Sequence, residues 1–75
     1  METKVKIDYI CKESELLTMV EFGQKWNVKV SFNDGEFTPY EMTIIGEEKD
    51  VKAFLITIGY TTQTNLESEF KAIKC

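Results

Sequence analysis

The two cysteines, Cys11 and Cys75, are the residues best suited to chemistry. A thiolate can act as a nucleophile or a metal ligand, but a neighbouring base or cation must first lower the pKa of the thiol. The sequence has no histidine and all nine basic residues are lysines, so only Lys12 lies beside Cys11 in the chain. We therefore expect Cys11 to be a buried structural thiol and Cys75 to be exposed.

The redox state of these thiols depends on the compartment. No recognisable secretory signal opens the sequence, which makes a reducing cytoplasm the default location and predicts that both thiols are free. A disulfide between Cys11 and Cys75 is the alternative. No apolar run approaches the roughly 18 residues that a membrane-spanning helix needs, so we expect a soluble, cytoplasmic protein.

The acidic residues are the next candidates for a site. Asp34, Glu36 and Glu41 surround a predicted turn, but their spacing differs from that of a calcium loop and one turn offers too few oxygen donors. The other acidic groups lie at predicted helix starts, where the helix dipole accounts for them; these are Glu13, Glu15, Glu47, Glu48 and Asp50. We expect no metal, no cofactor and no acid–base pair, and we predict that the protein is not an enzyme.

The charge balance bears on nucleic acid. The formal net charge is −4, whereas binding to a phosphate backbone requires a concentrated basic face. Tyr9 and Tyr40 could take the places of the stacking aromatics on the first and third strands of an RNA-recognition domain. No basic glycine-aromatic consensus accompanies them, so we do not expect nucleic-acid binding.

Hydrophobic periodicity predicts the first two elements that would position such residues. Residues 4–12 alternate, with Val5, Ile7 and Tyr9 on one face, as in a half-buried strand. Residues 14–26 form an amphipathic helix with Ser14 as a plausible N-cap. Gly23 lies inside its apolar stripe, where the missing side chain would let the helix approach a sheet.

Two further strands are predicted at residues 27–32 and 40–47, joined through Phe32-Asn-Asp-Gly-Glu-Phe-Thr-Pro39. A three-residue loop at 33–35 with a G1 bulge would pair Phe32 with Glu36 and Val28 with Tyr40. A longer loop running to Pro39 is the alternative. Either one places Phe37 off the helix-packed face and makes it a candidate partner-binding residue.

The rest of the chain is predicted to be mainly helical. Residues 46–60 show helical spacing, and Gly59 is suited to the position just after the helix end. Residues 64–75 leave two possibilities open. One is a helix that begins with a Thr64–Glu67 capping box, with a short fourth strand at 60–64 as an option before it, and the other is a fourth strand at 69–75.

This order predicts an α+β fold in one domain, residues 1–75. We expect the ferredoxin-like split β-α-β arrangement, an antiparallel sheet with the third strand between the first two and two helices on one face. In its strand-helix order and its Gly46-Glu-Glu-Lys-Asp-Val-Lys-Ala-Phe54 entry to the second helix, the stretch 4–60 resembles small regulatory domains of the ACT and NIL families. That resemblance implies small-ligand sensing at a dimer interface.

Two apolar residues outside the helical stripes, Leu17 and Ile56, suggest a surface for a partner. The alternative is that both helices bury wide faces and these two residues meet in the seam between them. We expect a non-enzymatic interaction or regulatory module that binds another protein or itself, of the kind found as inhibitors or adaptors in phages and mobile elements. An ACT-like ligand sensor is the alternative function.

Overall fold

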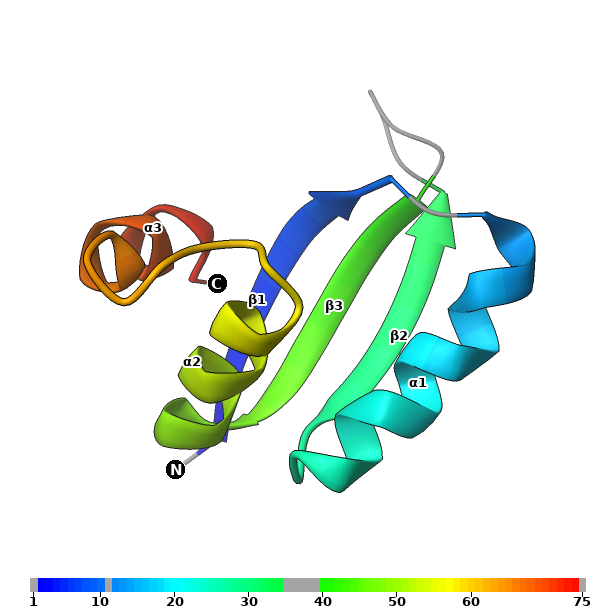
Figure 1. The fold of residues 1–75 in the computed structure, drawn as a ribbon, viewed down its shortest axis with the longest axis horizontal. Helices are drawn as coiled ribbons and strands as arrows, with labels where there is room; N and C mark the ends of the chain where they lie inside the picture. The colour runs from blue at the N-terminus through cyan, green and yellow to red at the C-terminus, as the bar shows by residue number, and fades with distance from the viewer. Residues whose placement is uncertain (1, 11, 35–39, 75) are drawn as a thin grey trace.

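The computed structural model describes residues 2–10, 12–34 and 40–74 and forms an α+β fold (Figure 1). In chain order the elements are β1 (Glu2–Tyr9), a short 3-10 helix (Glu13–Glu15), α1 (Leu16–Lys25), β2 (Lys29–Asp34), β3 (Tyr40–Glu47), α2 (Glu48–Thr57) and α3 (Leu66–Ile73).

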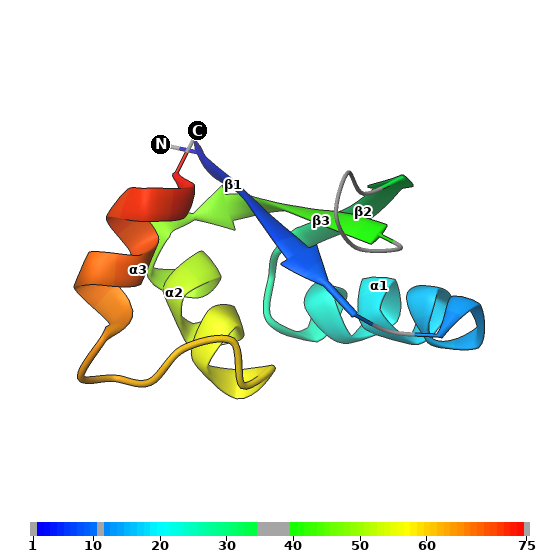
Figure 2. The same ribbon diagram turned by 90° about the horizontal axis from the view of Figure 1, so that it is seen from above.

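The sheet has three strands in the order β1-β3-β2. Strand β3 pairs antiparallel with both of its neighbours, so the third strand lies between the first two, as predicted. The helices lie on one side of this sheet, and its other face carries none of them (Figure 2). The strands and helices therefore form two layers with the apolar core between them.

The core consists of alternate residues on the strands and one stripe on each packed helix. Its buried members are Val5, Ile7, Val28, Val30, Met42, Ile44, Val51, Phe54, Leu55 and Phe70. Phe54 on α2 is fully buried, and its ring centroid is 5.8 Å from that of Phe22 on α1. This pair joins the two helices above the sheet.

The register of the hairpin corrects one prediction. Phe32 pairs with Met42 and Asp34 with Tyr40, so the three-residue loop that would place Phe32 opposite Glu36 is wrong. Both registers leave Val30 and Phe32 on the same face as Met42 and Ile44, but the observed one sets Phe32 opposite Met42 and Val30 opposite Ile44, apolar against apolar, instead of Phe32 opposite Glu36. Residues 35–39, Phe37 among them, lie outside the described residues.

Helix α1 sits very close to β2 through its glycine. A Cβ atom on Gly23 would lie 2.5 Å from Cγ2 of Val30, which confirms the predicted close approach. The helix ends where the Val28 N–H donates a hydrogen bond to the Gly23 carbonyl, 3.0 Å away, and Asn27 takes a φ of 62°. The prediction of Ser14 as N-cap is wrong, because this residue lies inside the 3-10 helix that precedes α1.

Helix α2 ends as its sequence predicts. Gly59 has a φ of 80°, a conformation that side chains rarely adopt. The N–H of Gly59 donates to the Ile56 carbonyl and that of Tyr60 to the Leu55 carbonyl, each at 3.0 Å. These two bonds are the Schellman pattern that terminates many helices.

The C-terminal segment takes the helical alternative, with α3 at Leu66–Ile73, and residues 60–64 form no strand. Its N-cap is Asn65 without a side-chain capping bond, so the Thr64–Glu67 capping box does not form. After the helix, Lys74 makes an isolated antiparallel bridge with Val5 of β1.

Lys52 of α2 connects the two C-terminal helices. Its Nζ lies 2.9 Å from a carboxylate oxygen of Glu67, 3.4 Å from one of Glu48, and 4.9 Å from the centroid of the Phe70 ring. The hydrogen bond to Glu67, more than any other cause, raises the pKa of Lys52 above its ordinary value of 10.5. The Lys52 ammonium thus contacts both a carboxylate and an aromatic ring of α3.

We expect Lys52→Met to loosen α3. The ion pairs and the cation–π contact disappear together, so amide exchange across Leu66–Ile73 should become faster. The matched control is Lys49→Met, which removes a lysine with no described ion-pair partner from the same helix and should leave α3 unchanged. Because the pKa of Lys52 is raised, its contribution is complete below pH 10.5 and is lost only as pH rises through the higher value. Equal exchange rates in the two variants would contradict this role.

Candidate binding surface

The two outer edges of the sheet differ in what covers them. Along β1, Lys74 bridges to Val5, and α3 packs against the strand. Along β2, no residue of the described ranges 2–10, 12–34 and 40–74 pairs with the outer side. Backbone N–H and C=O groups at such an edge are a template for a further strand.

Strand β2 shows different side chains on its two faces. Val30 is buried and Phe32 half-buried on the helix side, where the Phe32 ring lies edge-on to Tyr40 at 6.3 Å. Lys29, Ser31 and Asn33 are exposed on the other face. A strand added to β2 would therefore have one apolar and one polar row to match.

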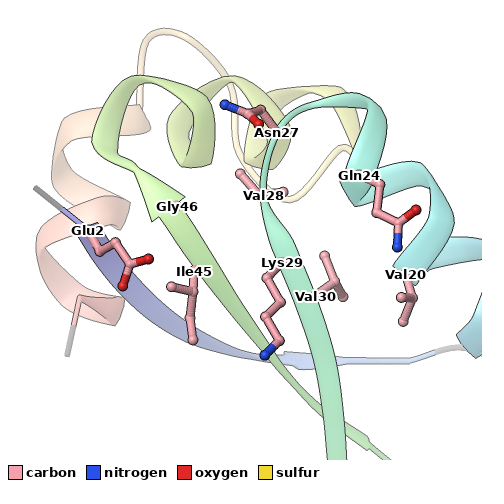
Figure 3. A pocket seen from close by; sticks show the side chains of 9 residues that line it. All are labelled: Glu2, Val20, Gln24, Asn27, Val28, Lys29, Val30, Ile45 and Gly46. Atoms are coloured by element: carbon pink, nitrogen blue, oxygen red, sulfur yellow. The ribbon is translucent and has the colours of Figure 1, made fainter.

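A shallow hollow of about 490 Å³ surrounds the first residues of β2 (Figure 3). Val20 and Gln24 reach it from α1, beside Val30, and Lys29 and Ile45 line it from the sheet. The complete lining is Glu2, Val20, Gln24, Asn27, Val28, Lys29, Val30, Ile45 and Gly46. The hollow thus joins the free edge of β2 to the side of α1.

Leu17 extends this apolar surface along α1. Residues three and seven positions apart lie on one side of a helix, which places Leu17 in line with Val20 and Gln24. Leu17 is 68% exposed. We call the outer edge of β2 together with this side of α1, represented by Leu17, Val20, Gln24 and Lys29–Asp34, the β2-edge surface.

The predicted site residues fall in different places. Leu17 lies on the β2-edge surface, Ile56 is half-buried on α2, and Phe37 is outside the described residues. Leu17 does not meet Ile56 in a seam, because α1 turns Phe22 toward α2 and Leu17 lies about 140° from Phe22 around the helix axis. The structure therefore keeps Leu17 and Ile56 apart.

Two exposed apolar residues were not selected from the sequence. Ile10 is 81% exposed directly after β1, and Trp26 is 37% exposed at the end of α1. The sequence does mark Ile10 as unusual, because it interrupts the polar face of the alternating segment 4–12. Nothing in the sequence marks Trp26 as exposed, since its spacing assigns it to the apolar stripe of the helix.

The helix-free face of the sheet carries charge in bands. Lys4 and Lys29 flank Ile45 in one row across the strands, and Lys6 lies in the next. Beyond them, Asp8 lies directly opposite Glu41, with Asn33 on the other side. Within the described ranges neither carboxylate has an ion-pair partner, and like charges directly opposite each other are unfavourable.

The groups considered for chemistry do not assemble into a site. Cys11, Cys75 and Glu36 lie outside the described residues. The part of the chain that the structure describes contains no group of three or more ligand residues that could hold a metal ion. Tyr9 and Tyr40 pair directly across β1 and β3, in phase with Ile7 and Met42, which places them on the helix side instead of the open face.

Nor does any described helix have the length and apolar character that crossing a membrane requires. Comparison of the chain with protein-family models, with curated proteins and with solved structures found no match. We therefore infer the function from the geometry of the β2-edge surface.

Proposed function

We propose that this protein is a non-enzymatic module that binds an extended segment of a partner protein along its β2-edge surface. The observation that carries the proposal is the difference between the two sheet edges. Lys74 and α3 cover part of β1, whereas no described residue pairs with the outer side of β2. Addition of a strand to an exposed edge is a common mode of peptide recognition.

The side of α1 supplies what a bare strand edge lacks. Backbone pairing alone gives affinity with little selectivity, and pockets beside the edge read alternate side chains of the added strand. Here Val20 and Leu17 offer apolar contact next to the edge, and Gln24 offers an amide. A segment with alternating apolar residues would fit this surface.

We further propose that the fold is a variant of the ferredoxin-like arrangement. The strand order and the crossover through α1 support it, because they are those of a split β-α-β unit. Lys74 supports it as well, because its antiparallel bridge to Val5 lies where a fourth strand would pair. In this variant α3 takes the place of most of that strand, and the edge that no described residue pairs with is that of β2.

A small-ligand sensor would use the same hollow and is the alternative function. Lys29 and Glu2 could hold opposite charges of a zwitterion. Small-molecule sites, however, usually enclose most of the ligand surface, and this hollow is shallow and continues into the strand edge. The geometry therefore favours an extended protein segment over a small molecule.

Selection from a random peptide display library tests the proposed function. We expect enriched peptides to alternate apolar and polar residues, and we expect Leu17→Asp to weaken their binding by about tenfold, because a charge replaces apolar contact. The matched control is Thr18→Asp, which adds the same charge to the next exposed residue of α1, about 100° away around the helix, and should bind like the original protein.

Other outcomes would count against the proposal. Absence of any enriched peptide, in a chain that also does not self-associate through β2, would remove the proposed function. Enriched peptides whose binding is equally sensitive to both variants, or that shift amide signals of β1 and α3 instead of β2, would move the site elsewhere. A rise in melting temperature with free amino acids or nucleotides, without peptide binding, would favour the ligand sensor.

A further inference from the structure

We infer that the partner of the β2-edge surface is a second copy of this chain, joined by antiparallel pairing of β2 with β2 about a two-fold axis through Ser31. This inference rests on the proposed function and names the partner for the same surface. In this register Ser31 lies opposite the partner's Ser31, Lys29 opposite the partner's Asn33, and Val30 opposite the partner's Phe32. The two sheets become one sheet of six strands with all helices on one side.

The charge bands on the open face match in this register. The row that contains Lys4 and Lys29 in one copy continues into the row that contains Asn33, Glu41 and Asp8 in the other. The backbones of Lys29 and the partner's Glu41 are two strand spacings apart, about 10 Å, a gap that two long side chains can close. The dimer thereby brings a cation toward the carboxylates of Asp8 and Glu41, which have no ion-pair partner among the described residues.

The apolar face matches as well. Phe32 is only half-buried in the single chain. The partner's Phe32 would arrive opposite Val30, at the hollow that Val20 and Val30 line. Because the pairing is symmetric, each copy fills the hollow of the other with an aromatic ring.

Neighbouring registers lose this agreement. A shift by two residues in one direction places Val30 opposite the partner's Asp34, an apolar residue against a charge. A shift in the other direction places Lys29 opposite the partner's Ser31 and moves its row away from the acidic row. A shift by one residue reverses the faces. The register centred on Ser31 is therefore the one that satisfies both faces.

Engineered disulfides test the register. In a Cys11→Ala, Cys75→Ala background, Ser31→Cys should form a covalent dimer rapidly under mild oxidation, because opposite Cβ atoms in an antiparallel pair lie about 5 Å apart. Lys29→Cys protein should link to Asn33→Cys protein when the two are mixed, and neither should link efficiently to itself. The control is Lys6→Cys, on the same face but far from the axis, which should not form a covalent dimer.

Equilibrium sedimentation of the original chain tests the dimer itself. The mass should rise with concentration from 8.7 kDa toward twice that value. Asn33→Lys places a lysine opposite the partner's Lys29 at two symmetric positions and should weaken the dimer several-fold. Adding Lys29→Glu to Asn33→Lys restores opposite charges and should recover most of the loss.

The outcomes separate this inference from the proposed function. A protein that stays at 8.7 kDa at millimolar concentration, yet still binds display-selected peptides at β2, overturns the inference and leaves the function. Efficient disulfide linkage through Lys6→Cys overturns the β2 register. So does a Lys29→Glu, Asn33→Lys double variant that dimerises no more strongly than Asn33→Lys alone. Dimerisation through β2 that excludes every peptide supports the inference and confines the function to self-association.

Discussion

Replacing Phe54 by alanine should leave much of the protein unfolded at 37 °C. Phe54 is fully buried and contacts Phe22, the aromatic connection between α1 and α2. Truncation of a buried phenylalanine costs about 3–5 kcal/mol, since the lost transfer free energy is increased by the cavity. A 75-residue domain has roughly 4–11 kcal/mol of stability in total. Urea denaturation followed by circular dichroism measures the loss.

Phe32→Ala is the matched control for Phe54→Ala. It removes the same atoms from a half-buried position on the free edge strand, so its cost to the monomer should be less than half as large. Equal destabilisation by the two variants would show that the core does not lie between α2 and the sheet as described.

Gly23→Ala should destabilise the protein by about 1–3 kcal/mol, the cost of forcing an extra carbon into a packed contact. In an ordinary helix the same change would stabilise by roughly 1 kcal/mol through helix propensity. The sign reverses here because the new methyl would lie 2.5 Å from Cγ2 of Val30 and 3.4 Å from the Val28 carbonyl oxygen. Helix α1 would have to move away from β2.

A double-mutant cycle isolates this contact. Val30→Ala removes the clashing methyl, so Gly23→Ala should cost clearly less in that background than alone. Thr18→Ala, at an exposed position of the same helix, should be neutral or slightly stabilising. Strict additivity of the Gly23 and Val30 substitutions would mean that the helix does not approach the strand at Gly23.

Local periodicity was sufficient to predict most of the elements. The 40–47 strand was predicted at its observed bounds, and the Gly59 helix end and the Gly23 approach follow from residue type and spacing. Strand order followed from the handedness of the crossover connection. These features depend on short-range patterns that tertiary packing here reinforces.

The hairpin register and the helix starts could not be predicted, because the local sequence allows more than one arrangement at each. The hairpin register depended on loop length, because pairing Phe32 with Glu36 or with Met42 leaves the same residues on the apolar face, and only the cross-strand partners differ. Ser14 and Thr64 do not form the predicted caps. Backbone hydrogen bonds form in the preceding turns instead, such as the one from the Glu15 N–H to the Lys12 carbonyl. Propensity for a cap does not decide where a helix begins.

The candidate surface was only partly foreseeable. Leu17 stands out in the sequence because it lies outside the apolar stripe, but the hollow around Val20 and Val30 depends on how α1 lies beside β2 (Figure 3). The outer position of β2 follows from the strand order, whereas the cover on the β1 edge comes from Lys74 and α3, a segment whose sequence left helix and strand both open. The hollow and this cover depend on contacts between segments far apart in the chain.

Amide hydrogen exchange of β2 tests the central claim most directly. In an edge strand every second amide points away from the sheet and exchanges quickly unless something pairs with it. We expect fast exchange at alternate positions of Lys29–Asp34 in dilute protein, and protection of those amides at high protein concentration or with a bound display-selected peptide. Uniform protection of β2 in dilute protein, or protection that appears on β1 while β2 stays unchanged, would contradict the β2-edge surface as the binding site.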